Sequence, residues 1–137
     1  MTESVASIFD NALERYKAGE NPETLIPVFK EICDNNPKDA TALSCLAWLY
    51  LLTDKPNQAL IAAQKSVKIE GRLPQARINL ALAMLDAGKT GVRKHIEVVQ
   101  QIIANNSEIR SDIEENIEDG LTRKPEWKSL QKVKTWL

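Results

Sequence analysis

Apolar residues of this chain recur at a spacing of 34 residues in three frames. The frames are Ala12, Leu46 and Leu80; Leu13, Ala47 and Ala81; and Tyr16, Tyr50 and Met84. A period of this length indicates helical hairpins that stack on one another. Because a single hairpin cannot bury its apolar face, neighbouring hairpins must pack together, and the stack leaves a curved surface that normally binds a partner.

Proline and glycine separate the helical segments, for example at Asn21-Pro, Asn36-Pro, Gly71-Arg-Leu-Pro and Gly88. The pattern predicts six helices, near residues 4–17, 23–34, 39–52, 56–69, 74–86 and 91–104. A short seventh helix follows from Ile109, Ile113 and Ile117, which repeat every fourth residue. Pro125 suits the first turn of an eighth helix that carries Trp127.

The third repeat departs from the 34-residue register in its second half. Strict register places Arg93, Glu97 and Gln100 where apolar residues belong. An amphipathic stripe nevertheless runs through Val92, Ile96, Val99 and Ile103. A shift of about three residues near Lys89-Thr-Gly-Val therefore restores a buried face.

The combination of period and residue size resembles the tetratricopeptide repeat (TPR) family, most closely in the second unit with its run Pro56-Asn-Gln-Ala-Leu-Ile-Ala-Ala-Gln-Lys-Ser-Val. The resemblance implies an all-α fold: a right-handed superhelical stack of about three helix-turn-helix repeats plus C-terminal capping helices. The implied single domain spans residues 1–137, with repeats at about 6–39, 40–73 and 74–106, and acidic and basic helices within 107–137.

In TPR proteins the first helix of each hairpin faces a concave groove, and the resemblance implies which residues line it here. One entrance carries the acids Asp10 and Glu14. The rest of the predicted partner-binding groove is apolar and consists of Trp48, Leu52, Ile78, Leu82 and Leu85. We expect a partner polypeptide to bind there, with Trp48 as the central contact and the acids favouring a basic flank on the ligand.

The same positions argue against a well-known use of the fold. Family members that hold the acidic C-terminal tails of heat-shock chaperones use Lys, Asn and Arg to bind carboxylates. The matching places in this chain carry Asp10, Glu14, Cys45, Gln75 and Asn79. Because carboxylates repel a carboxylate ligand, a chaperone tail is not the expected partner.

Two occupants of the groove remain open. Either a partner's helix or extended segment lies there, or the chain's own C-terminal helix folds back with Trp127 or Trp136. Self-association through the apolar patch is a third alternative. The main functional prediction is a non-enzymatic interaction module that serves as an assembly or scaffolding factor. The alternative is a structural subunit whose groove is closed by its own tail and which forms homo-oligomers.

The last two predicted helices differ in charge. Residues 107–119 hold six acids against Arg110, whereas five bases between Arg123 and Lys134 face only Glu126. The two helices either pair with each other, keep solvated faces, or present the basic one to an acidic partner with Trp127 and Trp136 as anchors.

Composition and motifs argue against several other classes. The formal net charge of −1 gives no basic field for nucleic acid, and no stretch approaches the ~20 uncharged residues that span a bilayer. The start Met-Thr-Glu-Ser-Val lacks the features of a secretory signal, so we expect a cytoplasmic protein. His95 is the only histidine, and no motif indicates catalysis, a cofactor or a metal. Cys33 and Cys45 are expected to be reduced packing residues.

Overall fold

The structure is a computed structural model, and it describes residues 5–137. This part of the chain is entirely helical, with no strand among the described residues. The helices are α1 (Val5–Lys17), α2 (Pro22–Asn35), α3 (Ala40–Leu52), α4 (Pro56–Ile69), α5 (Pro74–Asp86), α6 (Arg93–Ala104), α7 (Ser107–Arg123) and α8 (Lys128–Trp136). These bounds agree closely with the predicted ones, and the expected first residue, Ser4, lies outside the described residues.

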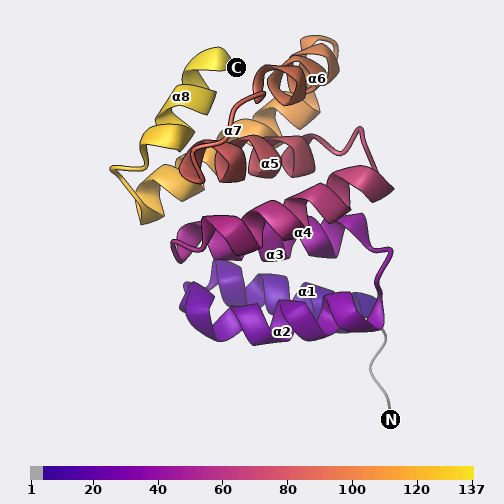
Figure 1. The fold of residues 1–137 in the computed structure, drawn as a ribbon. Helices are drawn as coiled ribbons and strands as arrows, with labels where there is room; N and C mark the ends of the chain where they lie inside the picture. Colours follow the sequence, from indigo (N-terminus) through magenta and orange to yellow (C-terminus); the bar gives the residue numbers. More distant parts are fainter. Residues whose placement is uncertain (1–4) are drawn as a thin grey trace.

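The first six helices form three antiparallel hairpins that stack from α1–α2 at the bottom of Figure 1 to α5–α6 at the top. Each helix contacts the next along the chain, and α3 also contacts α5, the first helix of the following hairpin. α7 and α8 complete the C-terminal end, where α8 lies against both α5 and α7. The predicted fold class, an all-α stack of about three hairpins with C-terminal helices, is confirmed.

Polar caps and prolines set where the helices begin. The side chain of Asn21 accepts a hydrogen bond from the Glu23 amide, and Asp39 accepts one from the Ala42 amide at the start of α3. Asn106 caps α7 in the same way through the Ile109 amide. Pro22, Pro56 and Pro74 begin α2, α4 and α5, because a proline in the first turn sacrifices no helical hydrogen bond.

The recurring apolar frame forms the core of the stack. Ala12, Leu46 and Leu80 are buried at equivalent places in successive hairpins. In the third hairpin Ile96, Val99 and Ile103 are buried, so the predicted shift in register is confirmed. A buried polar side chain, Ser66, also ties two helices together, because its hydroxyl donates to the Ala40 carbonyl at 2.7 Å.

The two C-terminal helices differ from the prediction in detail. α7 is 17 residues long rather than short, and it contains the buried Gly120. α8 begins at Lys128 with Trp127 as its N-cap, so the prediction that Pro125 lies in its first turn was wrong. The Trp127 amide instead donates to the Lys124 carbonyl at 3.0 Å, and this separate turn holds Pro125 between the two helices.

Candidate functional site

Trp48, the predicted central contact, lies on α3 and is 9% exposed. Its ring packs against Trp127 with 5.5 Å between the centroids and 46° between the planes. Its Nε1 donates to the Tyr16 hydroxyl at 2.8 Å. Gly120 of α7 faces the same ring, since a Cβ built there would lie 2.8 Å from Trp48 Cη2. Trp48 is therefore held between α1, α7 and the start of α8, with only an edge open to solvent.

The far end of the predicted groove is covered by α8. Ile78 and Leu82 on α5 are 1% and 0% exposed, and α8 lies against α5 with Leu130 and Val133 fully buried. Leu52 and Leu85 are partly buried against the same core. At this end of the molecule the chain's own C-terminal segment enters the groove, as one of the two alternatives predicts, and it does so through Trp127. Trp136, the other tryptophan considered for this role, is 39% exposed.

An opening remains at the other end of the concave face, between α1, α3, α5 and α7. It is a pocket with a cavity volume of ≈ 130 Å³, and we call it the concave pocket. Its apolar lining consists of Leu13, Tyr16, Phe29, Cys45, Trp48 and Leu49. Its polar lining consists of Ser44, Gln75, Asn79 and Asn116. Leu13, Cys45 and Gln75 are partly exposed, so the pocket communicates with solvent.

Tyr16 links the first and seventh helices across one side of this pocket. Its hydroxyl donates to the Asp119 carboxylate while it accepts from Trp48. The Arg123 guanidinium lies 4.0 Å from the Tyr16 ring centroid, and its Nε donates to Asp119 at 3.1 Å. Burial, followed by the hydrogen bond to Asp119, raises the pKa of Tyr16 well above its usual value. We call these four residues the Tyr16 network.

A chain of side-chain hydrogen bonds lines another side of the pocket. Asn116 of α7 donates to Gln75 of α5 at 3.0 Å, and Gln75 donates to Asn79 at 2.8 Å. The fully buried Asn79 donates in turn to the Ser44 carbonyl and hydroxyl at 2.9 and 3.0 Å. These contacts fix α7 over α5 and α3, and they place polar groups next to the apolar wall.

Exposed acidic side chains occur on α1 and α7, the helices that supply Leu13, Tyr16 and Asn116 to the pocket lining. Asp10 and Glu14 on α1 are exposed, and neither makes an ion pair within the described part of the chain. Asp112 on α7 is also exposed and precedes the pocket residue Asn116 by one helical turn. The exposed faces of these two helices therefore carry acids that make no ion pair among the described residues.

The acidic α7 and the basic α8 pair with each other only to a small extent. Lys134 Nζ lies 2.7 Å from Glu118 Oε1, and both side chains are more than half exposed. Asp119 pairs instead with Arg123 on its own helix, at 3.1 Å. Pairing and solvated faces both occur, so most of the α7 acids remain available to other charged groups.

Cys33, Cys45 and His95 are titratable residues whose pKa values are shifted by burial in the core. Cys33 and Cys45 are both free thiols, and burial raises their pKa to about 11 and about 12. His95 is buried and its Nδ1 lies 2.8 Å from Arg77 Nη1. Burial, and then the charge of Arg77, lowers the pKa of His95 to about 4. No cluster suited to a metal ion and no helix suited to crossing a membrane occurs among residues 5–137.

Sequence reasoning missed the contribution of α7 to this site. Asn116 and Asp119 lie outside the 34-residue repeat, so the family resemblance gives them no role. A glycine inside a helix often marks a close approach, and Gly120 was the available signal. The sequence pattern assigns Tyr16 only to the repeating apolar frame, although its hydroxyl joins α1, α3 and α7.

Comparison with known proteins places the chain in a class of stacked helical hairpins. No family model matches the sequence. No curated protein matches it either. Similar folds do occur among solved structures, and they agree over nearly the whole chain.

Three of these structures are of SycD, the type III secretion translocator chaperone of Yersinia enterocolitica. One, an alternative dimer, has a TM-score of 0.70 at 16% identity and covers 98% of this chain and 95% of its own. Another is a complex with a peptide of the translocator YopD, with a TM-score of 0.71, 16% identity and the same coverage. A third has a TM-score of 0.70 and covers 96% of this chain and 86% of its own. At this level of identity the likeness establishes the fold.

Proposed function

We propose that the chain is a divergent tetratricopeptide repeat protein that binds a segment of a partner polypeptide and acts as a cytoplasmic assembly factor or chaperone. The observation that carries the proposal is the partly open concave pocket between α1, α3, α5 and α7. The similarity to SycD supports it, since that protein has been crystallised with a peptide of its translocator.

The proposed binding surface is narrower than the groove expected from sequence. Trp48 lines the pocket, and Asp10 and Glu14 are exposed acids on α1, which supplies Leu13 and Tyr16 to the same lining. Leu52 and Leu85 are partly buried, whereas Ile78 and Leu82 belong to the buried core and are closed to a ligand. We propose no catalytic role, because His95 is committed to Arg77 and the thiols of Cys33 and Cys45 have raised pKa values.

Site-specific photocrosslinking in the source cells tests this function. A photoreactive residue replaces the partly exposed Gln75 at the pocket, and a matched one replaces the exposed Gln64 on α4. We expect one defined polypeptide to crosslink from position 75 and not from position 64. Equal, diffuse labelling from both positions would contradict binding at the pocket.

A second candidate function is a structural subunit that self-associates. It is favoured by the packing of Trp127 on Trp48, which closes one end of the groove from within, and by the exposure of Trp136. Size-exclusion chromatography with light scattering distinguishes the two functions. A stable homo-oligomer that Trp136→Ala dissociates would favour the subunit, and a monomer would favour the partner-binding protein.

A further inference from the structure

The size of the concave pocket limits what can enter it. An engineered protein cavity of about 150 Å³ holds benzene. At ≈ 130 Å³ the concave pocket therefore has room for one medium-sized apolar side chain rather than for a helix face. Ile78 and Leu82, further along α5, are 1% and 0% exposed, so neither is open to a second apolar side chain of the ligand.

The polar side of the pocket suits a peptide backbone. Asn116 is exposed, and its amide nitrogen is used in the bond to Gln75. Its carbonyl oxygen has no partner among the described residues, so it can accept a hydrogen bond from a ligand N–H. The apolar wall of the pocket can contact one side chain of a ligand, and the Asn116 carbonyl oxygen can accept a hydrogen bond from the ligand's adjoining main-chain N–H.

The acids on α1 and α7 favour particular residues in the ligand next to the side chain that enters the pocket, which we call the anchor. Asp10 precedes the pocket residue Leu13 by three residues on α1, and Asp112 precedes Asn116 by four on α7. These spacings correspond to about one helical turn, or ~5 Å. An extended ligand advances ~3.3 Å per residue, so a cation about two residues from the side chain in the pocket would come within reach of these acids.

The opposing charges near these acids are few. Lys17 is the exposed amine on α1 that follows Asp10 and Glu14. Arg15 is engaged by Glu20 at 2.7 Å, and Arg123 is engaged by Asp119. Arg110 lies on the other side of α7, where it lines a depression with Ile103 and Leu137. An acidic ligand would therefore meet like charge, whereas a basic one would be attracted.

We propose that the concave pocket binds a polypeptide segment in which one leucine, isoleucine, methionine or phenylalanine is flanked by lysine or arginine. The inference rests on the proposed function and deepens it by stating the chemistry of the partner. The apolar anchor supplies affinity through burial, and the flanking cations distinguish the segment from other apolar peptides.

Selection from a random peptide library displayed on phage tests the chemistry without a known partner. The full chain is the target of the selection. Peptides that also bind variants in which a larger side chain fills the pocket are discarded. Cys45→Leu and Leu13→Trp are two independent pocket-filled variants, each used once circular dichroism and melting show a native fold. We expect the selected peptides to share one apolar residue with Lys or Arg within a few positions.

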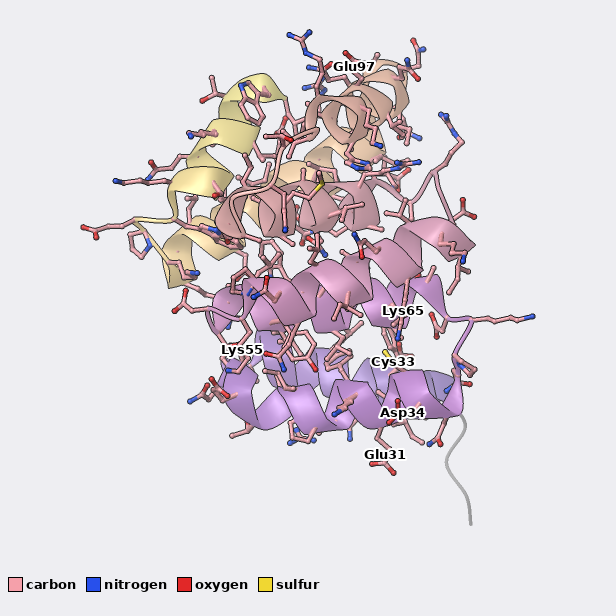
Figure 2. All side chains as sticks on the ribbon, viewed as in Figure 1. Glu31, Cys33, Asp34, Lys55, Lys65 and Glu97 are labelled. Atoms are coloured by element: carbon pink, nitrogen blue, oxygen red, sulfur yellow. The ribbon has the colours of Figure 1, made fainter. Side chains whose placement is uncertain are left out.

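Charge reversal then tests whether Asp10 and Asp112, which we call the acidic rim, attract the peptide more than acids elsewhere on the surface do. Asp10→Lys combined with Asp112→Lys changes the rim, and Glu31→Lys combined with Asp34→Lys makes the same change on α2, where Figure 2 labels both control residues. For two exposed charges we expect the rim variant to weaken binding of a selected peptide by about fivefold to tenfold at low salt. The control variant should bind within about twofold of the original chain.

The indole N–H signals in NMR spectra report where the peptide binds. Addition of a selected peptide should shift the Trp48 signal and leave that of the exposed Trp136 unchanged. Pocket-dependent peptides with acidic or uncharged flanks would overturn this inference while leaving the proposed function intact. Absence of any pocket-dependent peptide, or a homodimer that Leu13→Trp dissociates, would overturn both.

Discussion

Gly120 shows how a single absent side chain positions an element. It lies inside α7, where glycine is unfavourable by about 1 kcal/mol relative to alanine. A Cβ at this place would lie 2.6 Å from Leu130 Cδ2 and 2.8 Å from Trp48 Cη2. The glycine therefore permits α7 to approach both the concave wall of α3 and the buried face of α8.

Substitution of Gly120 by alanine tests this close approach. Overpacking against Trp48 and Leu130 should cost about 1–3 kcal/mol, which exceeds the gain in helix propensity. We expect urea denaturation to give a lower free energy of unfolding for Gly120→Ala. Ser111→Ala, at an exposed place on the same helix, should be neutral or slightly stabilising. A more stable Gly120→Ala protein would show that α7 is not closely packed here.

Tyr16 supplies a second test at the level of single atoms. Tyr16→Phe keeps the ring beneath Arg123 but removes the hydroxyl that joins Trp48 to Asp119. The Trp48 indole N–H then loses its partner, and the free energy of unfolding should fall by about 1–3 kcal/mol. Tyr50→Phe is the control, and denaturation with fluorescence detection is the measurement. Equal stability of Tyr16→Phe and the original chain would contradict a structural role for the network.

Of the two tryptophans at the ends of α8, the N-cap Trp127 is buried and Trp136 is not. Trp127 is 5% exposed and packs on Trp48, whereas Trp136 is 39% exposed. Trp127→Ala should therefore cost about 3–5 kcal/mol. Trp136→Ala should cost less than about 1 kcal/mol, as for most surface changes. Thermal unfolding of the two variants checks this order, and a reversed order would mean that α8 docks through its other end.

The contact of His95 on α6 with Arg77 on α5 should make the free energy of unfolding depend on pH. The folded state holds His95 neutral with a pKa of about 4, whereas an unfolded histidine titrates near 6.5. The unfolded chain therefore binds the proton first as the pH falls, and stability that is present above pH ~6.5 is lost between pH ~6.5 and 4.

Replacement of His95 by glutamine isolates this effect. Glutamine can still accept a hydrogen bond from Arg77 but does not titrate. We expect the melting temperature of His95→Gln to fall less steeply between pH 6.5 and 4 than that of the original chain. Identical slopes would assign the acid sensitivity to carboxylates alone.

At the scale of the whole molecule, the sequence predicts the stack of three hairpins better than it predicts how α7 and α8 cover the end of that stack. Prolines and caps mark the helix bounds directly, and the 34-residue period identifies the residues that face the core. The path of α7 and α8 depends instead on long-range contacts, such as Tyr16 with Asp119 and Trp48 with Trp127. No local pattern encodes those pairs, so the sequence left the covering of Ile78 and Leu82 undecided.

A chain that ends at Lys124 tests whether the C-terminal helix completes the fold. It lacks Trp127, Leu130 and Val133, which are all buried, so Trp48 and the α5 residues beneath α8 become exposed. A repeat stack without its end cap presents an apolar surface that associates with other copies. We expect this chain to melt at a lower temperature and to elute as dimers or larger species in size-exclusion chromatography with light scattering.

A chain that ends at Thr135 provides the matched control for that experiment. It loses Trp136 and Leu137 but retains the buried face of α8, so it should stay in the oligomeric state of the full chain. If the Lys124 chain had the same size and melting temperature as the full chain, α8 would not be a cap. The concave face would then be open over its whole length, and Ile78 and Leu82 would belong to the binding surface after all.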